Sequence, residues 1–262
     1  MMKRLFGAAA AVLLLAGSLH AMQAGEIIRK SQSAFLSQGE DFKARVVMKL
    51  ITKDGKERLR EMTMLRKNYT GGEQKYFIYF FRPADVRDMT FMVHKYPGRD
   101  DDRWLFVPAI NMVRRIAAKD KASSFVGSDF SYEDVSGRDP EEDAHELVRE
   151  EALNGRDCYV VKSTPKAGDM DWSHKLTWVD KENFLPLKEE YFDRRGEPYR
   201  VFTADEVMNV DGFPTVTRRT MRNLRSGHRT EVAFIKTEYN VGIKDSLFSE
   251  RFLRRPPKRW IE

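Results

Sequence analysis

Apolar and polar residues alternate in short runs along most of this sequence, and this period of two limits the available folds more than any other feature. Residues 42–52 show it clearly, with an apolar residue at every second position from Phe42 to Leu50. Such alternation places successive side chains on opposite faces of a β-strand. The pair Asp54-Gly55 that follows is typical of a hairpin turn, because the turn needs positive φ at its central positions.

Twelve further runs continue the pattern, at residues 58–67, 75–82, 90–96, 103–108, 112–117, 144–153, 158–164, 174–180, 186–192, 199–210, 213–223 and 229–239. Turn signals separate several of them: Asn154-Gly155, Arg195-Gly196, Asp211-Gly212 and Ser226-Gly227. No helical pattern alternates with the strands, so the runs predict one large, meandering antiparallel sheet. A sheet of that size curls and offers a concave face.

Two segments outside these runs are candidates to cover the sheet. Residues 25–38 fit an amphipathic helix that Gly39 could end. Residues 119–143 are rich in Ser, Asp and Gly and predict a long ordered loop, a kind of segment that is often functional. Residues 76–81 and 104–107 are bulky and apolar on both faces, and such runs need cover on both sides. The helix and the loop could cover one side, and a neighbouring layer or a ligand the other.

We expect residues 1–21 to be a cleaved secretory signal peptide. Lys3 and Arg4 precede an apolar stretch, residues 5–16, that is shorter than the roughly 20 residues of a membrane span. Cleavage after Ala21 is expected, with cleavage after Ala24 as the near alternative. No cysteine lies near either position, so we expect residues 22–262 to form a single soluble domain in the periplasm.

The reactive residues do not predict an enzyme, a metal site or a cofactor. Gly127-Ser128-Asp129 lacks the Gly-x-Ser-x-Gly pattern of a nucleophile elbow, and Cys158 lies in an apolar run typical of an inert core thiol. Asp100-Asp101-Asp102 is interpreted as a solvated turn. Four histidines stand far apart, outside any metal-binding spacing, and are interpreted as surface or structural: His94, His145, His174 and His228. The net charge of +6 is mild and its signs are interspersed, so we expect no nucleic-acid partner.

Five segments, taken in order, resemble the outer-membrane lipoprotein-sorting proteins, the periplasmic carriers related to LolA and LolB. Four are similar to family strands and to the family's C-terminal end: Phe42-Lys43-Ala44-Arg45, Trp104-Leu105-Phe106-Val107-Pro108, Leu176-Thr177-Trp178-Val179-Asp180, and Asp245-Ser246-Leu247-Phe248 followed by Pro256-Pro257. The fifth and most distinctive, residues 123–134, looks like the signature of a LolA-like subgroup.

The resemblance implies a mainly β fold: an incomplete, strongly curved antiparallel β-barrel with the N-terminal helix and short helices or the loop covering its open face. It also implies a monomeric periplasmic carrier that binds acyl chains of a lipoprotein or lipid for transport to or from the outer membrane. An inner-membrane transporter and an outer-membrane acceptor would be its partners. The alternative is a periplasmic interaction subunit of a membrane lipid exporter that binds protein instead of lipid. An enzyme built from scattered carboxylates is the third interpretation.

For such a carrier we expect the lipid cavity to be lined by Val46, Met48, Leu50, Met62, Met64, Phe77, Tyr79, Phe81, Phe91, Trp104 and Phe106. Phe125, Phe130 and Tyr132 are expected on the lid, with Arg45 bonding lid carbonyls in a closed state. The alternatives are ordinary core packing for the lining residues and a solvated strand arginine for Arg45.

Overall fold

The alternating runs form one antiparallel sheet of thirteen strands in a computed structural model that describes residues 22–168 and 170–261. The expected signal peptide, residues 1–21, lies outside the described residues. Each predicted strand is present within two residues of its predicted bounds. The strands are β1 (Asp41–Ile51), β2 (Glu57–Asn68), β3 (Gln74–Arg82), β4 (Thr90–Lys95), β5 (Asp102–Val107), β6 (Met112–Ile116), β7 (Asp143–Leu153), β8 (Arg156–Pro165), β9 (His174–Asp180), β10 (Pro186–Phe192), β11 (Pro198–Val210), β12 (Phe213–Asn223) and β13 (Arg229–Tyr239).

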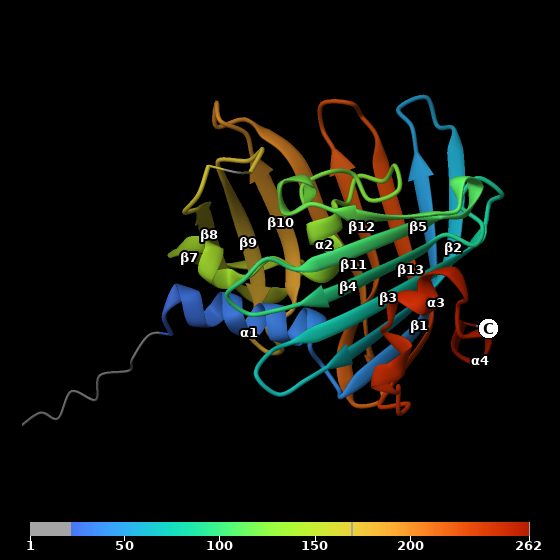
Figure 1. Ribbon diagram of the computed structural model, residues 1–262. Coiled ribbons are helices and arrows are strands. Elements are labelled where there is room, and N and C mark those ends of the chain that lie inside the picture. Colours follow the sequence, from blue (N-terminus) through green and yellow to red (C-terminus); the bar gives the residue numbers. More distant parts are fainter. Residues whose placement is uncertain (1–21, 169, 262) are drawn as a thin grey trace, which may run out of the picture.

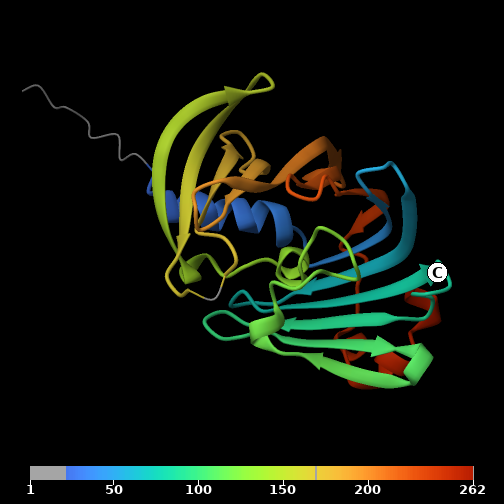
Figure 2. The same ribbon diagram turned by 90° about the horizontal axis from the view of Figure 1, so that it is seen from above.

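The sheet curls strongly but stays open. Its strand order is β6-β5-β4-β3-β2-β1-β13-β12-β11-β10-β9-β8-β7, so the first and last strands pair in the middle and β6 and β7 form the two edges. Figure 2 shows the curve from above, with the two halves of the sheet facing each other across its interior. The predicted incomplete, strongly curved antiparallel barrel is therefore confirmed.

Helices lie on both sides of the sheet. The predicted N-terminal helix is confirmed as α1 (Ala24–Leu36), which packs across the concave side of β7 to β10 and β12 (Figure 1). The short α2 (Tyr132–Ser136) also lies inside the curve, whereas α3 (Glu250–Arg254) and α4 (Lys258–Ile261) lie outside it (Figure 2). Single 3-10 turns are η1 (Pro108–Ile110), η2 (Ala118–Asp120), η3 (Pro140–Glu142) and η4 (Asp245–Leu247). No helix among the described residues is long and apolar enough to cross a membrane.

The strands that carry bulky apolar side chains on both faces are covered on both sides, as their sequence requires. On β3, Tyr76, Ile78 and Phe80 belong to the large concave-face core, whereas Phe77 belongs to a second core on the convex face. The convex core is covered by the C-terminal segment, where Thr90 Oγ1 donates to the carbonyl of Leu253 at 2.8 Å. The second cover is thus a neighbouring layer supplied by the chain itself.

The position of Asp101 differs from the solvated turn predicted at residues 100–102. Its side chain is only 5% exposed and accepts a hydrogen bond from Arg103 Nη2 at 2.7 Å, with Lys95 Nζ at 3.6 Å. The interpretation of residues 100–102 as a solvated turn is therefore wrong for Asp101, because an aspartate beside two buried cations is retained in the interior. Cys158, by contrast, is buried as expected.

Candidate functional site

The loop predicted at residues 119–143 is an ordered cover over the concave face. We call residues 117–142, which join edge strands β6 and β7, the covering segment. Its Phe125 and Tyr132 rings lie 5.3 Å from the ring of Phe91 on β4, and Phe125 is 6.0 Å from Phe80 on β3. Phe125, Phe130 and Tyr132 are all buried, so the aromatic side chains of the segment fill space that the curved sheet encloses.

Polar contacts attach the covering segment to the second half of the sheet. Asp129 lies 2.6 Å from Nδ1 of His228 and accepts a hydrogen bond from Thr230 Oγ1 at 2.7 Å. Asp134 accepts from Nη1 of Arg200 at 2.9 Å and also closes a capping box with Ser131 at the start of α2. The segment is therefore held at defined points by side chains from β11 and β13.

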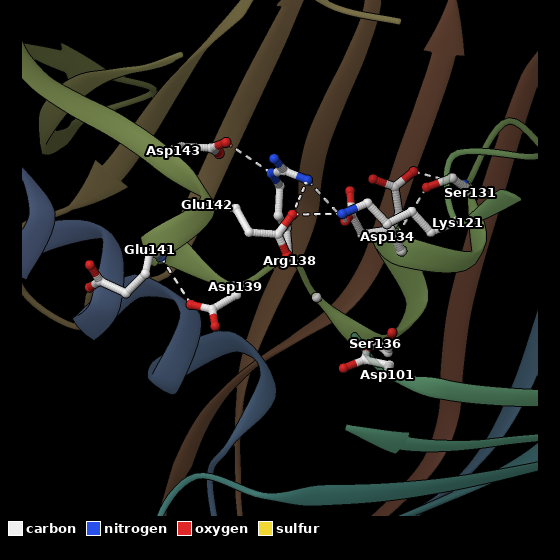
Figure 3. A network of polar contacts seen from close by, with 12 residues as sticks. Asp101, Lys121, Ser131, Asp134, Ser136, Arg138, Asp139, Glu141, Glu142 and Asp143 are labelled. Atoms are coloured by element: carbon white, nitrogen blue, oxygen red, sulfur yellow. Dashed lines mark hydrogen bonds and ion pairs between the residues drawn. The ribbon is translucent and has the colours of Figure 1, made fainter. Parts of the chain in front are cut away.

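A chain of ion pairs fixes the C-terminal part of the segment. In Figure 3, Arg138 lies between Asp143 and Glu142, with Lys121 reaching Glu142 from the other side; these contacts are 2.9, 2.7 and 2.6 Å long. Glu133 lies 3.1 Å from Arg138 and 3.3 Å from Lys121. Burial raises the pKa of the Glu133 carboxyl above its ordinary value, against the opposing attraction of these two cations.

A cavity of about 120 Å³ lies between α1, the covering segment and strands β7 to β12. Its wall combines apolar and polar side chains. The apolar ones include Phe35, Phe130, Met170, Trp172, Phe202 and Met221, and the polar ones include Arg138, His145, Lys175, Glu189, Arg200 and Arg219. The wall therefore suits an amphipathic ligand better than a purely apolar one.

Two carboxylates of the cavity wall, Glu189 and Asp134, are already engaged. Glu189 accepts hydrogen bonds from Lys175 Nζ at 2.7 Å and from Tyr191 Oη at 2.6 Å. Burial alone would raise the pKa of Glu189, but Lys175 and Tyr191 hold it below its ordinary value. Glu189 is thus paired with Lys175, and Asp134 is paired with Arg200. No group of three or more His, Cys, Asp or Glu that could hold a metal occurs within residues 22–168 and 170–261.

Arg219 differs from every other cation of this wall. Its guanidinium lies 4.9 to 5.4 Å from the ring centres of Phe234, Phe35 and Phe130. Burial lowers its pKa to about 10, so it remains charged at neutral pH. Among the described residues it has no ion pair and no hydrogen-bond acceptor, and its Nε is fully buried. Sequence reasoning missed Arg219. The only local signal was its place two residues before the apolar Met221, which puts both side chains on the same face of a strand.

Six of the eleven predicted lining residues share the concave-face core with Phe125, namely Val46, Met48, Leu50, Met62, Met64 and Phe91. None of them lines the cavity itself, which lies farther along the sheet, beside α1. The concave face therefore has two parts. In one part the aromatic side chains of the covering segment pack against the sheet, and the other part contains the cavity. Phe130 belongs to both, because it lies in the concave core and also lines the cavity.

The other five predicted lining residues lie on the convex face with the second core, namely Phe77, Tyr79, Phe81, Trp104 and Phe106. The expectation that they share one surface with Met48 is wrong. The pairing register explains it, since Met64 lies opposite Ile78 and Leu65 opposite Phe77, and directly opposed residues share a face. Arg45 is on the convex side as well, where it donates to Glu61 at 2.9 Å, so its expected bonds to lid carbonyls are not made.

Comparison with known proteins agrees with this architecture. A family model described as that of an uncharacterized protein matches residues 72–255. Among solved structures, the chain is similar to a DUF1329 family protein from Desulfovibrio piger, with 31% identity and a TM-score of 0.80 over 87% of this chain and 95% of that one. It is also similar to a domain assigned as an outer membrane lipoprotein-sorting protein from Vibrio parahaemolyticus, with 27% identity and a TM-score of 0.82 over 88% and 98% of the two chains.

A LolA superfamily protein from Nitrosomonas europaea shares the fold, with 21% identity and a TM-score of 0.70 over 88% of this chain and all of that one. No curated protein matches the sequence. The chain therefore belongs to the DUF1329 family and has the fold of the LolA superfamily.

Proposed function

We propose that this protein is a periplasmic carrier that binds the acyl chain of a lipid or lipoprotein on the concave face of its sheet, beneath the covering segment. The observation that carries the proposal is the cavity that α1 and the covering segment enclose against the open, curved sheet. The likeness to a lipoprotein-sorting domain supports the same function. Residues 22–262 would act as one exported domain, after removal of residues 1–21.

The energetics of transfer support an enclosed apolar site. Each buried CH₂ group of an acyl chain is worth about 0.8 kcal/mol, so the chain leaves a membrane only for a comparably apolar surface. Met170 and Met221 on the cavity wall are flexible, polarizable side chains that adapt to such a ligand. Met48, Met62 and Met64 extend this adaptable surface under the covering segment.

The cavity is smaller than an acyl chain would need. Sites for molecules of drug size enclose about 300–1,000 Å³, whereas this cavity measures about 120 Å³. An acyl chain would therefore displace side chains of the covering segment, above all Phe130, which borders the cavity, and then Phe125 and Tyr132. The covering segment would act as the lid that opens for loading and closes again over the ligand.

The engaged carboxylates support binding over catalysis. A general base has to be free to accept a proton from a substrate, and both Glu189 and Asp134 are already bound to cations. The ligand would pass from a donor at the inner membrane to an acceptor at the outer membrane, with the protein acting as a monomer. These partners match the role of a carrier whose cargo cannot cross water alone.

Blocking the cavity tests the proposal. Ala122 lies in the covering segment and lines the cavity, so Ala122→Trp should fill part of it, whereas Ala117→Trp places the same ring at an exposed position of the same segment. After a thermal melt confirms folding, both variants and the wild type are titrated with a fluorescent fatty-acyl probe. We expect at least about tenfold weaker binding for Ala122→Trp, a loss of about 1.4 kcal/mol, and wild-type binding for Ala117→Trp.

Two results would contradict the proposal in different ways. Wild-type affinity in a folded Ala122→Trp protein would remove the cavity as the binding site. If neither the wild type nor Ala117→Trp binds an acyl probe, the carrier function gives way to that of a transporter subunit that binds protein.

A further inference from the structure

The wall of the cavity includes a cation, Arg219, that has no ion-pair partner among the described residues. Arg219 projects from β12 to the concave face, where three aromatic rings surround its guanidinium within 5.4 Å. Asp134, the acid whose charge acts most on Arg219, is already bound to Arg200 at 2.9 Å. Arg219 is partly buried and its Nε is fully buried without an acceptor, which is costly because this donor has given up water without gaining a partner.

Two other arginines of the same wall also present donors without a partner. Nε of Arg200 and Nη2 of Arg138 are buried and make no hydrogen bond in the described part of the chain, as is true of Nε of Arg219. All three side chains line the cavity. Three arginines that carry an unsatisfied donor thus line one cavity, and an oxyanion is the group that satisfies guanidinium donors best.

We propose that the ligand of this cavity is a single-chain amphiphile whose anionic head group, a carboxylate or a phosphate, binds Arg219. This inference rests on the proposed function and adds the chemistry of the head group to it. The acyl chain would extend from Arg219 along the apolar wall formed by Phe202, Met221 and Trp172. Arg200 and Arg138 supply additional donors around the head group.

The surroundings of Arg219 favour an anion over a neutral polar group. Phe35 from α1, Phe130 from the covering segment and Phe234 from β13 limit access by water, and an ion pair is stronger where water is excluded. Phe130 connects the head group with the lid, because the ring that borders Arg219 belongs to the segment that has to move during loading. Closure of the covering segment would therefore shield the ion pair once it has formed.

The test compares three ligands with the same chain: dodecanoate, dodecyl phosphate and the neutral dodecanol. Each competes, below its micelle concentration and at neutral pH, with the fluorescent acyl probe on wild type, Arg219→Met and Arg218→Met. Arg218 is the matched control, because this neighbouring arginine is 62% exposed and pairs with Glu206 on the other face. Thermal melts of all three proteins report on folding.

We expect at least one of the two anions to bind the wild type and Arg218→Met about tenfold or more tightly than dodecanol. In Arg219→Met this preference should fall to within about threefold, while dodecanol binding is retained and the melting temperature is not lowered. The anion that binds more tightly identifies the head group as a fatty-acid carboxylate or a phosphate.

Other outcomes overturn the inference without ambiguity. If both anions bind the wild type no better than dodecanol does, the head-group inference fails and the carrier function stands. If Arg219→Met keeps the full preference, the anion binds elsewhere. If none of the three ligands displaces the probe, the proposed function itself fails. If Arg219→Met does not fold, the comparison of the two anions with dodecanol on the wild type still tests whether the site prefers an anionic head group.

Discussion

Arg200 on β11 and Asp134 on α2, which are 66 residues apart, form an ion pair of 2.9 Å between the sheet and the covering segment. The same carboxylate accepts a hydrogen bond from the backbone N–H of Ser131 at 2.7 Å and so stabilises the start of α2. The side chain of Asp134 therefore stabilises the start of α2 and also links the covering segment to the sheet. The stability of the closed form depends on this contact.

Asp134→Asn should destabilise the protein and weaken the attachment of the covering segment to the sheet. The substitution keeps the size of the side chain but leaves the guanidinium of Arg200 buried without a counter-ion, which costs about 2–4 kcal/mol. The melting temperature should fall by on the order of 10 °C, and limited proteolysis should cut within residues 117–142 sooner. Glu141→Gln is the control, since its pair with Arg29 is 68% and 55% exposed and should contribute little. Equal melting temperatures for the two variants would contradict the assigned role of Asp134.

Gly137→Ala should destabilise the protein more than Gly155→Ala. Both glycines have positive φ, +83° and +80°, so an added Cβ is strained at either position. At Gly137 the new atom would also overlap Cδ1 of Leu36 on α1, whereas nothing lies within 4 Å at Gly155. Urea unfolding should show Gly137→Ala to be less stable than Gly155→Ala by at least about 1 kcal/mol. A difference near zero would mean that α1 and the covering segment are not packed together here.

Stability should decrease as the pH falls from about 7.5 to 5. Burial lowers the pKa values of His94, His145 and His174 below their ordinary value. Histidine binds protons more readily in the unfolded chain than in such a fold, so stability is full above the unfolded pKa of about 6.5 and declines below it. Melting temperatures across this range measure the effect.

His145→Gln should reduce that decline. His145 Nε2 lies 2.9 Å from the carbonyl of Pro140 and Nδ1 lies 2.9 Å from Ser163 Oγ, contacts that a neutral side chain satisfies. Glutamine offers a donor and an acceptor without a proton to gain. An unchanged pH profile in His145→Gln would show that the other histidines carry the dependence.

The strands could be predicted from the sequence because their signals are local. Alternation and the Gly-containing turns fix where each strand begins and ends, and the N-terminal helix follows from its own period. Residues 76–81 could not be assigned to faces, because bulky apolar side chains occupy every position from Tyr76 to Phe81. Only the register of β3 with β2 decides that Phe77 faces the C-terminal segment.

The cavity could not be predicted because its wall is assembled from distant segments. Arg218 and Arg219 are adjacent and chemically identical, and nothing in the sequence marks one as external and the other as internal. The structure separates them: Arg218 pairs with Glu206, whereas Arg219 lies among three aromatic rings from α1, the covering segment and β13. Long-range packing of this kind leaves no pattern along the chain.

The most direct test of the proposed ligand site is a fluorescence measurement that shows which tryptophan a bound acyl chain approaches. Trp172 lines the cavity on the concave side, whereas Trp104 lies on the convex face beside His94. A fatty acid brominated along its chain quenches the fluorescence of nearby indoles, and it would be titrated into wild type, Trp172→Phe and Trp104→Phe. The account predicts saturable quenching that is lost in Trp172→Phe and kept in Trp104→Phe. The reverse result, with quenching lost only in Trp104→Phe, would contradict a ligand site under the covering segment.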